Sequence, residues 1–217
     1  MPVINTALFK SKIEASLSIA GQENEKLIIS YPALKTGTGY APATIQLEFG
    51  ARATGEPNHV HDVGCDIANV IDGVDFPAAR PLVMAAERTF WEKATAAHVY
   101  CLQGRLRGER YSRHWYDLAA IARSAHYESA VSDQELGKKV AEHKSMFFPE
   151  KDAAGVKVDY HRAVTGKIQL IPTGESLAAL EGDYSAMLED GLLALHQPDF
   201  SDLIENCRAI EMRINRG

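Results

Sequence analysis

Apolar and polar residues follow two different patterns along this chain, and the change comes near residue 85. Residues 25–31 (EKLIISY) and 43–49 (ATIQLEF) are short, β-branched and aromatic, with a Pro/Gly/Thr segment between them. Such runs predict two paired strands joined by a loop. Residues 65–71 and 81–84 are further strand candidates. Residues 4–20 have a loosely amphipathic spacing, which predicts a helix.

After residue 86 the apolar positions recur with helical spacing. Phe90, Ala94, Ala97 and Cys101 form one stripe, and Gly104 is a natural stop. Further helices are predicted at 113–125, 133–147, 176–195 and 199–215, whereas the weakly patterned segment 150–172 is predicted to be a mobile loop. We therefore expect an α+β fold, with a small mixed β-sheet in residues 1–85 packed on a mostly helical region, residues 86–217.

Composition narrows the function classes. The 217 residues are 46% hydrophobic, without the apolar run of a membrane helix or the pattern of a signal peptide, so we expect a cytoplasmic protein and no membrane partner. The three cysteines form no Cys-x-x-Cys pair, which disfavours a disulfide framework or a zinc ribbon. A net charge of −6 disfavours nonspecific nucleic-acid binding by the whole molecule. One local basic cluster is formed by Arg105, Arg107, Arg110 and Arg113.

Lys93 and Asp117 are the first candidates for chemistry. Lys93 lies beside the apolar stripe of its predicted helix, so its ammonium must extend to solvent or meet an anion. Asp117 falls in the first turns of the next predicted helix, and two antiparallel helices joined by a short loop would bring the two side chains together. From the pattern alone, an ordinary ion pair at a helix start explains both residues.

Five blocks along the chain carry a family resemblance. They are Tyr31-Pro32, 47–52 (LEFGAR), 89–94 (TFWEKA), 112–117 (SRHWYD) and 183–187 (DYSAM). In order and spacing they resemble blocks of the AbiEii/AbiGii nucleotidyltransferase toxins, over about residues 27–215. The resemblance implies a polymerase-β-like domain that transfers nucleotides, as the toxin of a type IV toxin–antitoxin or abortive-infection system.

The resemblance also implies roles for single residues. Lys93 would bind the nucleotide phosphates and Asp117 would be an essential acid, as the catalytic pair. The substrate-binding residues would be Ser112, Arg113, Tyr116 and Arg52, and Glu48 would be a strand carboxylate that binds metal. The implied cofactor is Mg²⁺ with an NTP substrate. The implied partners are an RNA acceptor such as a tRNA, and a cognate antitoxin.

One part of the family pattern is missing. Family members begin with a Gly-Ser turn followed by Asp-x-Asp on a strand, whereas this sequence has no aspartate before Asp62 and no Gly-Ser dipeptide. Because those aspartates hold the metal ions, we expect weak or no activity from the chain alone. The expectation includes a truncated product, or a half that works with a separately encoded amino-terminal piece.

Two alternatives remain open. A noncatalytic remnant would bind a nucleotide, an RNA or a partner through the basic stretch 105–113. A metal-binding hydrolase would use the cluster of potential ligands in the segment after residue 58, because His and Cys suit zinc: His59, His61, Asp62, Cys65 and Asp66.

Overall fold

The computed structural model describes residues 16–20, 26–30, 37–50, 54–73, 75–106, 110–193 and 197–217. These residues form two compact units. The first contains the described parts of residues 1–53 and 182–197, and the second those of residues 54–181 and 198–217. The predicted division at residue 85 stays a prediction.

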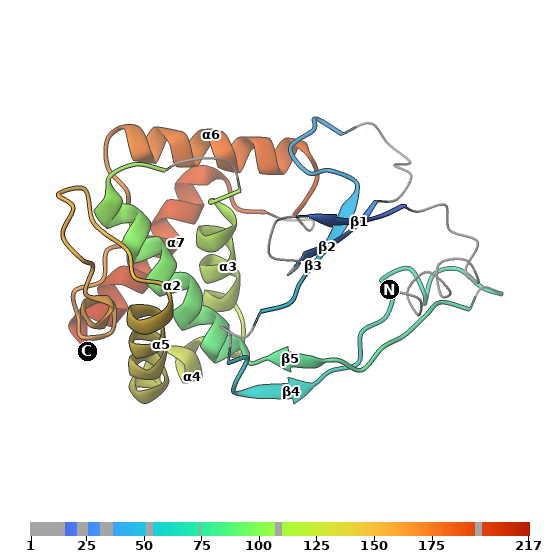
Figure 1. Cartoon of the computed structure of the whole chain (residues 1–217), viewed down its shortest axis with the longest axis horizontal. Coiled ribbons are helices and arrows are strands. Elements are labelled where there is room, and N and C mark those ends of the chain that lie inside the picture. The colour runs from blue at the N-terminus through green and yellow to red at the C-terminus, as the bar shows by residue number, and fades with distance from the viewer. Residues whose placement is uncertain are drawn as a thin grey trace. The chain divides into compact units, whose positions relative to one another are not determined.

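The first unit is built on a three-stranded sheet, β1 (Ser16–Ala20), β2 (Lys26–Ser30) and β3 (Thr44–Glu48), in the order β1-β2-β3 (Figure 1). Both strand pairs are antiparallel. In β2 the alternation of apolar and polar residues buries Leu27 and Ile29, as expected for a strand with one covered face. The predicted pairing of the strands within 25–31 and 43–49 is confirmed.

A loop of the same unit is fastened to the C-terminal part of helix α6 (Glu175–Glu189) and the residue after it. The Asp190 carboxylate accepts hydrogen bonds from the Thr38 hydroxyl (2.8 Å) and from the backbone N–H groups of Thr38 (2.9 Å) and Ala41 (3.0 Å). The Tyr40 hydroxyl donates to Asp183 at 2.7 Å. The bonds from Thr38 lower the pKa of Asp190 because they stabilise its charged form. The loop therefore has a defined anchor although it lacks regular structure.

The second unit is mostly helical. Its α-helices are α2 (Ala86–Gln103), α3 (Arg113–Ala122), α4 (Tyr127–Ser132), α5 (Gln134–Phe147), the first turns of α6, and α7 (Phe200–Arg216). A 3₁₀ turn η1 spans Tyr160–Val164, and a two-stranded antiparallel ribbon joins β4 (Asn58–Val60) to β5 (Leu82–Met84). Helix α2 packs on α3, α4 and α5, and α3 packs on α7. The α+β class expected from the sequence is confirmed.

The core of the helical unit surrounds the apolar stripe of α2. Phe90, Trp91, Ala94 and Ala97 are fully buried, and the helix ends at Gly104 with a left-handed φ of 65°. At Gly137 of α5, a Cβ atom would lie only 2.9 Å from the Trp91 ring. Glycine is therefore required there to let α5 approach α2 closely.

Two predicted elements are wrong. Residues 16–20 form a strand, because the sequence SLSIA alternates with a period of two and pairs with β2; residues 4–15 of the predicted helix lie outside the described residues. Residues 66–70, predicted as strand, form turns.

The segment 150–172, predicted as a mobile loop, is packed into the helical unit. Tyr160 and Leu170 are buried, and the Trp115 indole N–H donates to the Leu170 carbonyl at 2.6 Å. Apart from those in the short 3₁₀ turn η1, its buried apolar residues lie in irregular backbone, so no helix or strand periodicity shows in the sequence. No helix within the described residues is long and apolar enough to cross a membrane.

Candidate functional site

Lys93 and Asp117 meet on neighbouring helices of the second unit. The Lys93 Nζ atom of α2 lies 2.7 Å from Asp117 Oδ2 of α3. The two side chains are 24% and 35% exposed, so the pair is neither buried nor fully solvated. The antiparallel packing expected from the sequence thus brings the two predicted residues together, while their catalytic roles stay predictions.

A pocket of about 550 Å³ opens beside this ion pair. That volume lies within the range of ordinary small-molecule sites. One part of its wall is apolar and includes Val83, Met84, Ala120 and Ile121. The polar part brings together residues from β4, the segment after it, α2, α3 and the turn before α4: His59, His61, Glu87, Thr89, Lys93, Asp117 and His126. The pocket therefore offers a cation and an apolar surface within one cavity.

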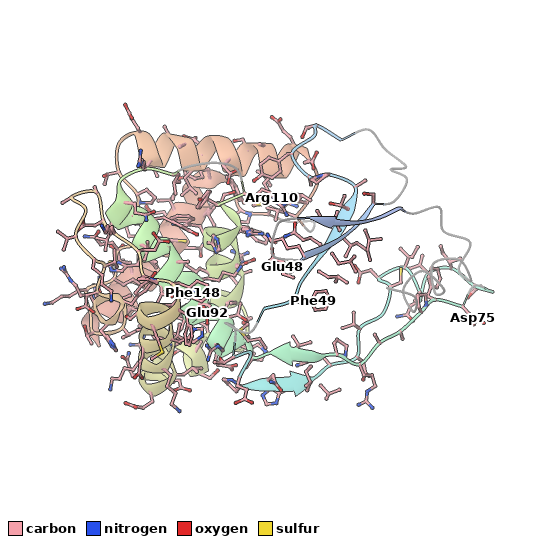
Figure 2. The ribbon with its side chains drawn as sticks, viewed as in Figure 1. Glu48, Phe49, Asp75, Glu92, Arg110 and Phe148 are labelled. Carbon is pink, nitrogen blue, oxygen red and sulfur yellow. The ribbon has the colours of Figure 1, made fainter. Side chains whose placement is uncertain are left out.

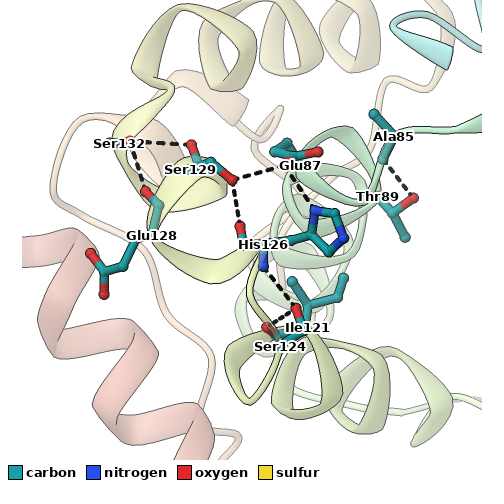
Figure 3. A network of polar contacts seen from close by, with 9 residues as sticks. All are labelled: Ala85, Glu87, Thr89, Ile121, Ser124, His126, Glu128, Ser129 and Ser132. Carbon is teal, nitrogen blue, oxygen red and sulfur yellow. Dashed lines mark hydrogen bonds and ion pairs between the residues drawn. The ribbon is translucent and has the colours of Figure 1, made fainter. Parts of the chain in front are cut away.

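Glu87 and His126 form a second polar centre in this pocket (Figure 3). The Glu87 carboxylate lies 3.1 Å from His126 Nδ1 and accepts a hydrogen bond from the Ser129 hydroxyl at 2.8 Å. A backbone hydrogen bond at the start of α2, together with Ser129 and His126, lowers the pKa of Glu87. Glu87 is therefore a carboxylate, and it orients the imidazole ring.

The other predicted substrate-binding residues lie outside the lining of this pocket. Ser112 is buried at the start of α3, Arg113 is exposed, and Tyr116 is half-buried. Arg52 lies outside the described residues. Of the basic cluster, Arg105 and Arg110 are exposed, and Arg110 has a φ of 71°.

His114 lies among the cations of this region. Burial, and to a smaller extent the nearby charges of Lys93, Arg113 and Lys144, lower its pKa to about 3. The ring is thus neutral at physiological pH. Lys144 itself pairs with Glu92 at 2.8 Å and lies over the Phe148 ring, so its charge is already partnered.

Glu48, the predicted metal ligand, lies at the end of β3 in the first unit (Figure 2). Its carboxylate is 2.8 Å from the Lys26 ammonium and also accepts a hydrogen bond from the Gln46 side chain. The Glu48 side chain is 61% exposed. Its surroundings are those of an ordinary surface ion pair across two strands.

The described residues do not fit a resident magnesium ion. Within them, no group of three or more His, Cys, Asp or Glu side chains is placed to hold a metal. Mg²⁺ requires several oxygen ligands in near-octahedral geometry, and Asp117 is already paired with Lys93. We therefore assign no metal-dependent step to these residues.

The lack of a metal-binding group of side chains among the described residues also leaves the predicted zinc hydrolase without structural support. His59 and His61 both line the pocket, but Asp62 is paired with Arg80 at 2.8 Å and Cys65 is exposed. In the part of the chain that the structure describes, the five potential ligands form no metal-binding cluster.

Sequence reasoning missed Glu87 and His126 as partners in the pocket. Thirty-nine positions separate them, and no spacing rule connects residues so far apart. The only available signal was the location of Glu87 in the first turn of a predicted helix, where an acidic residue is favoured by the helix dipole anyway.

Comparison with known proteins assigns the chain to one family. The family model described as nucleotidyl transferase AbiEii toxin, type IV toxin–antitoxin system, matches residues 3–206. The chain belongs to this family. Searches of curated proteins and of solved structures returned no match. The family implies a nucleotide substrate and a cognate antitoxin.

Proposed function

We propose that this chain is a toxin of the AbiEii family that binds a nucleoside triphosphate in the pocket beside Lys93 and Asp117. The observation that carries this proposal is the placement of the partly exposed Lys93 ammonium on the wall of a cavity of about 550 Å³. Family membership supplies the substrate class.

The pocket chemistry supports a phosphate-bearing ligand with an apolar part. A lysine ammonium binds phosphate oxygens as a compact point charge. Val83 and Ile121 provide apolar wall on which a nucleobase can pack. Asp117 competes with the phosphates for Lys93, so the ion pair must loosen when the ligand binds. Asp117 is then released next to the nucleotide, where the family resemblance expects its essential acid.

Nucleotidyl transfer by the chain alone is proposed to be weak or absent. In-line transfer depends on positioning and on neutralising the phosphate charge, usually by two carboxylate-held metal ions. Among the described residues that carboxylate cluster is missing. An RNA acceptor, and a partner or further polypeptide that supplies the carboxylates, belong to this proposal.

Calorimetric titration of the chain with each of the four nucleoside triphosphates tests the site. Lys93→Ala is expected to weaken binding by about tenfold or more, because a charge-assisted hydrogen bond contributes roughly 1.5–3 kcal/mol. Lys138→Ala is the matched control, since Lys138 is an exposed lysine of the same unit that pairs with Glu135 outside the pocket. Equal affinity of the Lys93 variant and the wild type for nucleoside triphosphates would contradict the assignment of the nucleotide site to this pocket.

A noncatalytic nucleotide-binding protein is the second candidate, and the lack of a carboxylate cluster among the described residues favours it. Incubation with labelled nucleoside triphosphates, Mg²⁺ and total RNA separates the two candidates. Labelled RNA whose formation requires Lys93 supports a transferase. Nucleotide binding without any labelled RNA supports the noncatalytic protein.

A further inference from the structure

We propose that His126 accepts a hydrogen bond from a ribose hydroxyl of the bound nucleotide and so makes the pocket selective for ribonucleotides. This inference rests on the proposed function, since it places a nucleotide in the same cavity. It assigns a specificity-determining role to a residue outside the blocks that resemble the family.

The first step of the argument is the tautomer of the ring. An ionised carboxylate can only accept, so Glu87 at 3.1 Å from Nδ1 places a proton on that nitrogen. In the neutral imidazole the other nitrogen, Nε2, is then an acceptor. Figure 3 shows Nε2 on the side of the ring away from Glu87.

The second step is the rigidity of this arrangement. The Ser129 hydroxyl lies 2.8 Å from the Glu87 carboxylate and 2.9 Å from the His126 carbonyl, and its single proton is shared between these two acceptors. The His126 backbone N–H in turn donates to the Ser124 hydroxyl at 3.2 Å. Both the ring and its backbone are therefore anchored, which lowers the entropic cost of binding a ligand there.

The third step concerns the type of ligand group that can bind to Nε2 of His126, a hydrogen-bond acceptor. Among the described residues, no hydrogen bond is made to Nε2, so this acceptor is available to a ligand that carries a donor. Phosphate oxygens at neutral pH do not donate, whereas ribose hydroxyls do. Glu87 and Lys93 are six positions apart on α2, roughly 9 Å along the helix axis. A nucleoside triphosphate spans such a separation between its phosphates and its sugar.

Calorimetry on the full-length chain tests the inference, with the four ribonucleoside triphosphates and their 2′-deoxy and 3′-deoxy analogues. A pH of about 8 keeps an ordinary imidazole neutral. The wild type is expected to bind ribonucleotides roughly 3- to 10-fold more tightly than at least one deoxy series, as for one neutral hydrogen bond. His126→Ala is expected to lose this preference and to bind the deoxy analogue as the wild type does.

Two further variants sharpen the test. Glu87→Gln keeps the shape of the side chain but removes the charge that orients the ring, and it is expected to reduce the preference. His161→Ala changes another exposed histidine of the same unit, outside the pocket, and is expected to leave it intact.

The outcomes separate this inference from the function on which it rests. Equal binding of ribo- and deoxyribonucleotides by the wild type, or a preference that survives His126→Ala, overturns it. So does a preference that follows the base instead of the sugar. Absence of any binding, or equal binding by wild type and Lys93→Ala, overturns the nucleotide site itself.

Discussion

One Lys–carboxylate pair of the helical unit and one of the sheet unit have similar geometry but different surroundings. Lys93–Asp117 in the helical unit and Lys26–Glu48 in the sheet unit have almost equal lengths, 2.7 and 2.8 Å. The helical pair is 24% and 35% exposed beside a pocket, whereas the sheet pair is 49% and 61% exposed. Distance alone therefore does not identify a site; partial burial next to a cavity does.

The packing in the two units also differs, and it is tighter in the helical unit. The helical unit buries Trp91 and Trp115 completely, while Ile45 and Phe49 of the sheet unit are more than half exposed. A rigid core holds the helical pair in place, because side chains in a close-packed interior cannot rearrange cheaply.

The largest expected effect concerns this difference in packing. Trp115→Ala removes a fully buried indole that donates to the Leu170 carbonyl, and it should lower the free energy of unfolding by about 3–5 kcal/mol. Ile45→Ala changes a 52% exposed side chain and should stay within about 0.5 kcal/mol. Urea unfolding measures both, followed by Trp91 fluorescence for the first variant and by circular dichroism for the second. Similar losses of unfolding free energy for the two variants would contradict the proposed difference in packing between the two units.

A second prediction concerns pH and the helical core. Burial lowers the pKa of His98 to about 4, and its Nδ1 accepts a hydrogen bond from the Gln169 backbone. Between about pH 6.5 and 4 the unfolded chain binds a proton that the folded chain does not. The contribution of His98 to the free energy of unfolding should therefore be fully present above about pH 6.5. It should fall by roughly 3 kcal/mol as the pH is lowered toward 4.

The control for this prediction is His98→Asn. Its side-chain oxygen can replace Nδ1 as the acceptor but cannot be protonated. Urea unfolding at several pH values should show a shallower loss of stability for the variant than for the wild type. An unchanged slope would show that other groups control the acid limit.

The smallest expected effect tests the two pairs directly. Asp117→Asn removes the charge that competes with phosphate for Lys93, so the affinity for a nucleoside triphosphate without metal should rise a few-fold. Glu48→Gln should leave the affinity unchanged, because Glu48 pairs with Lys26 at an exposed strand. Calorimetry with both variants measures this. A weaker affinity of the Asp117 variant would mean that the carboxylate holds the ligand rather than the lysine.

The sequence predicted the regular parts of the helical unit well. The stripe from Phe90 to Ala97 and the stop at Gly104 both appear in α2, since helical periodicity and a left-handed glycine are local properties. It failed for residues 150–172, whose burial depends on contacts such as that between Trp115 and Leu170. Such contacts join positions far apart in the chain and leave no periodic signal.

For the candidate site, too, some features could be predicted from the sequence and others required the structure. The class of fold, the family and the pairing of two charged residues on adjacent helices could be predicted from the sequence alone. Periodicity and the order of motifs can be read directly from it. Tertiary structure decided that a cavity opens at Lys93, that Glu87 orients His126 there, and that Glu48 pairs with Lys26. Cavities and long-range polar contacts arise only when helices pack, since they depend on distances between residues that the order of the sequence does not fix.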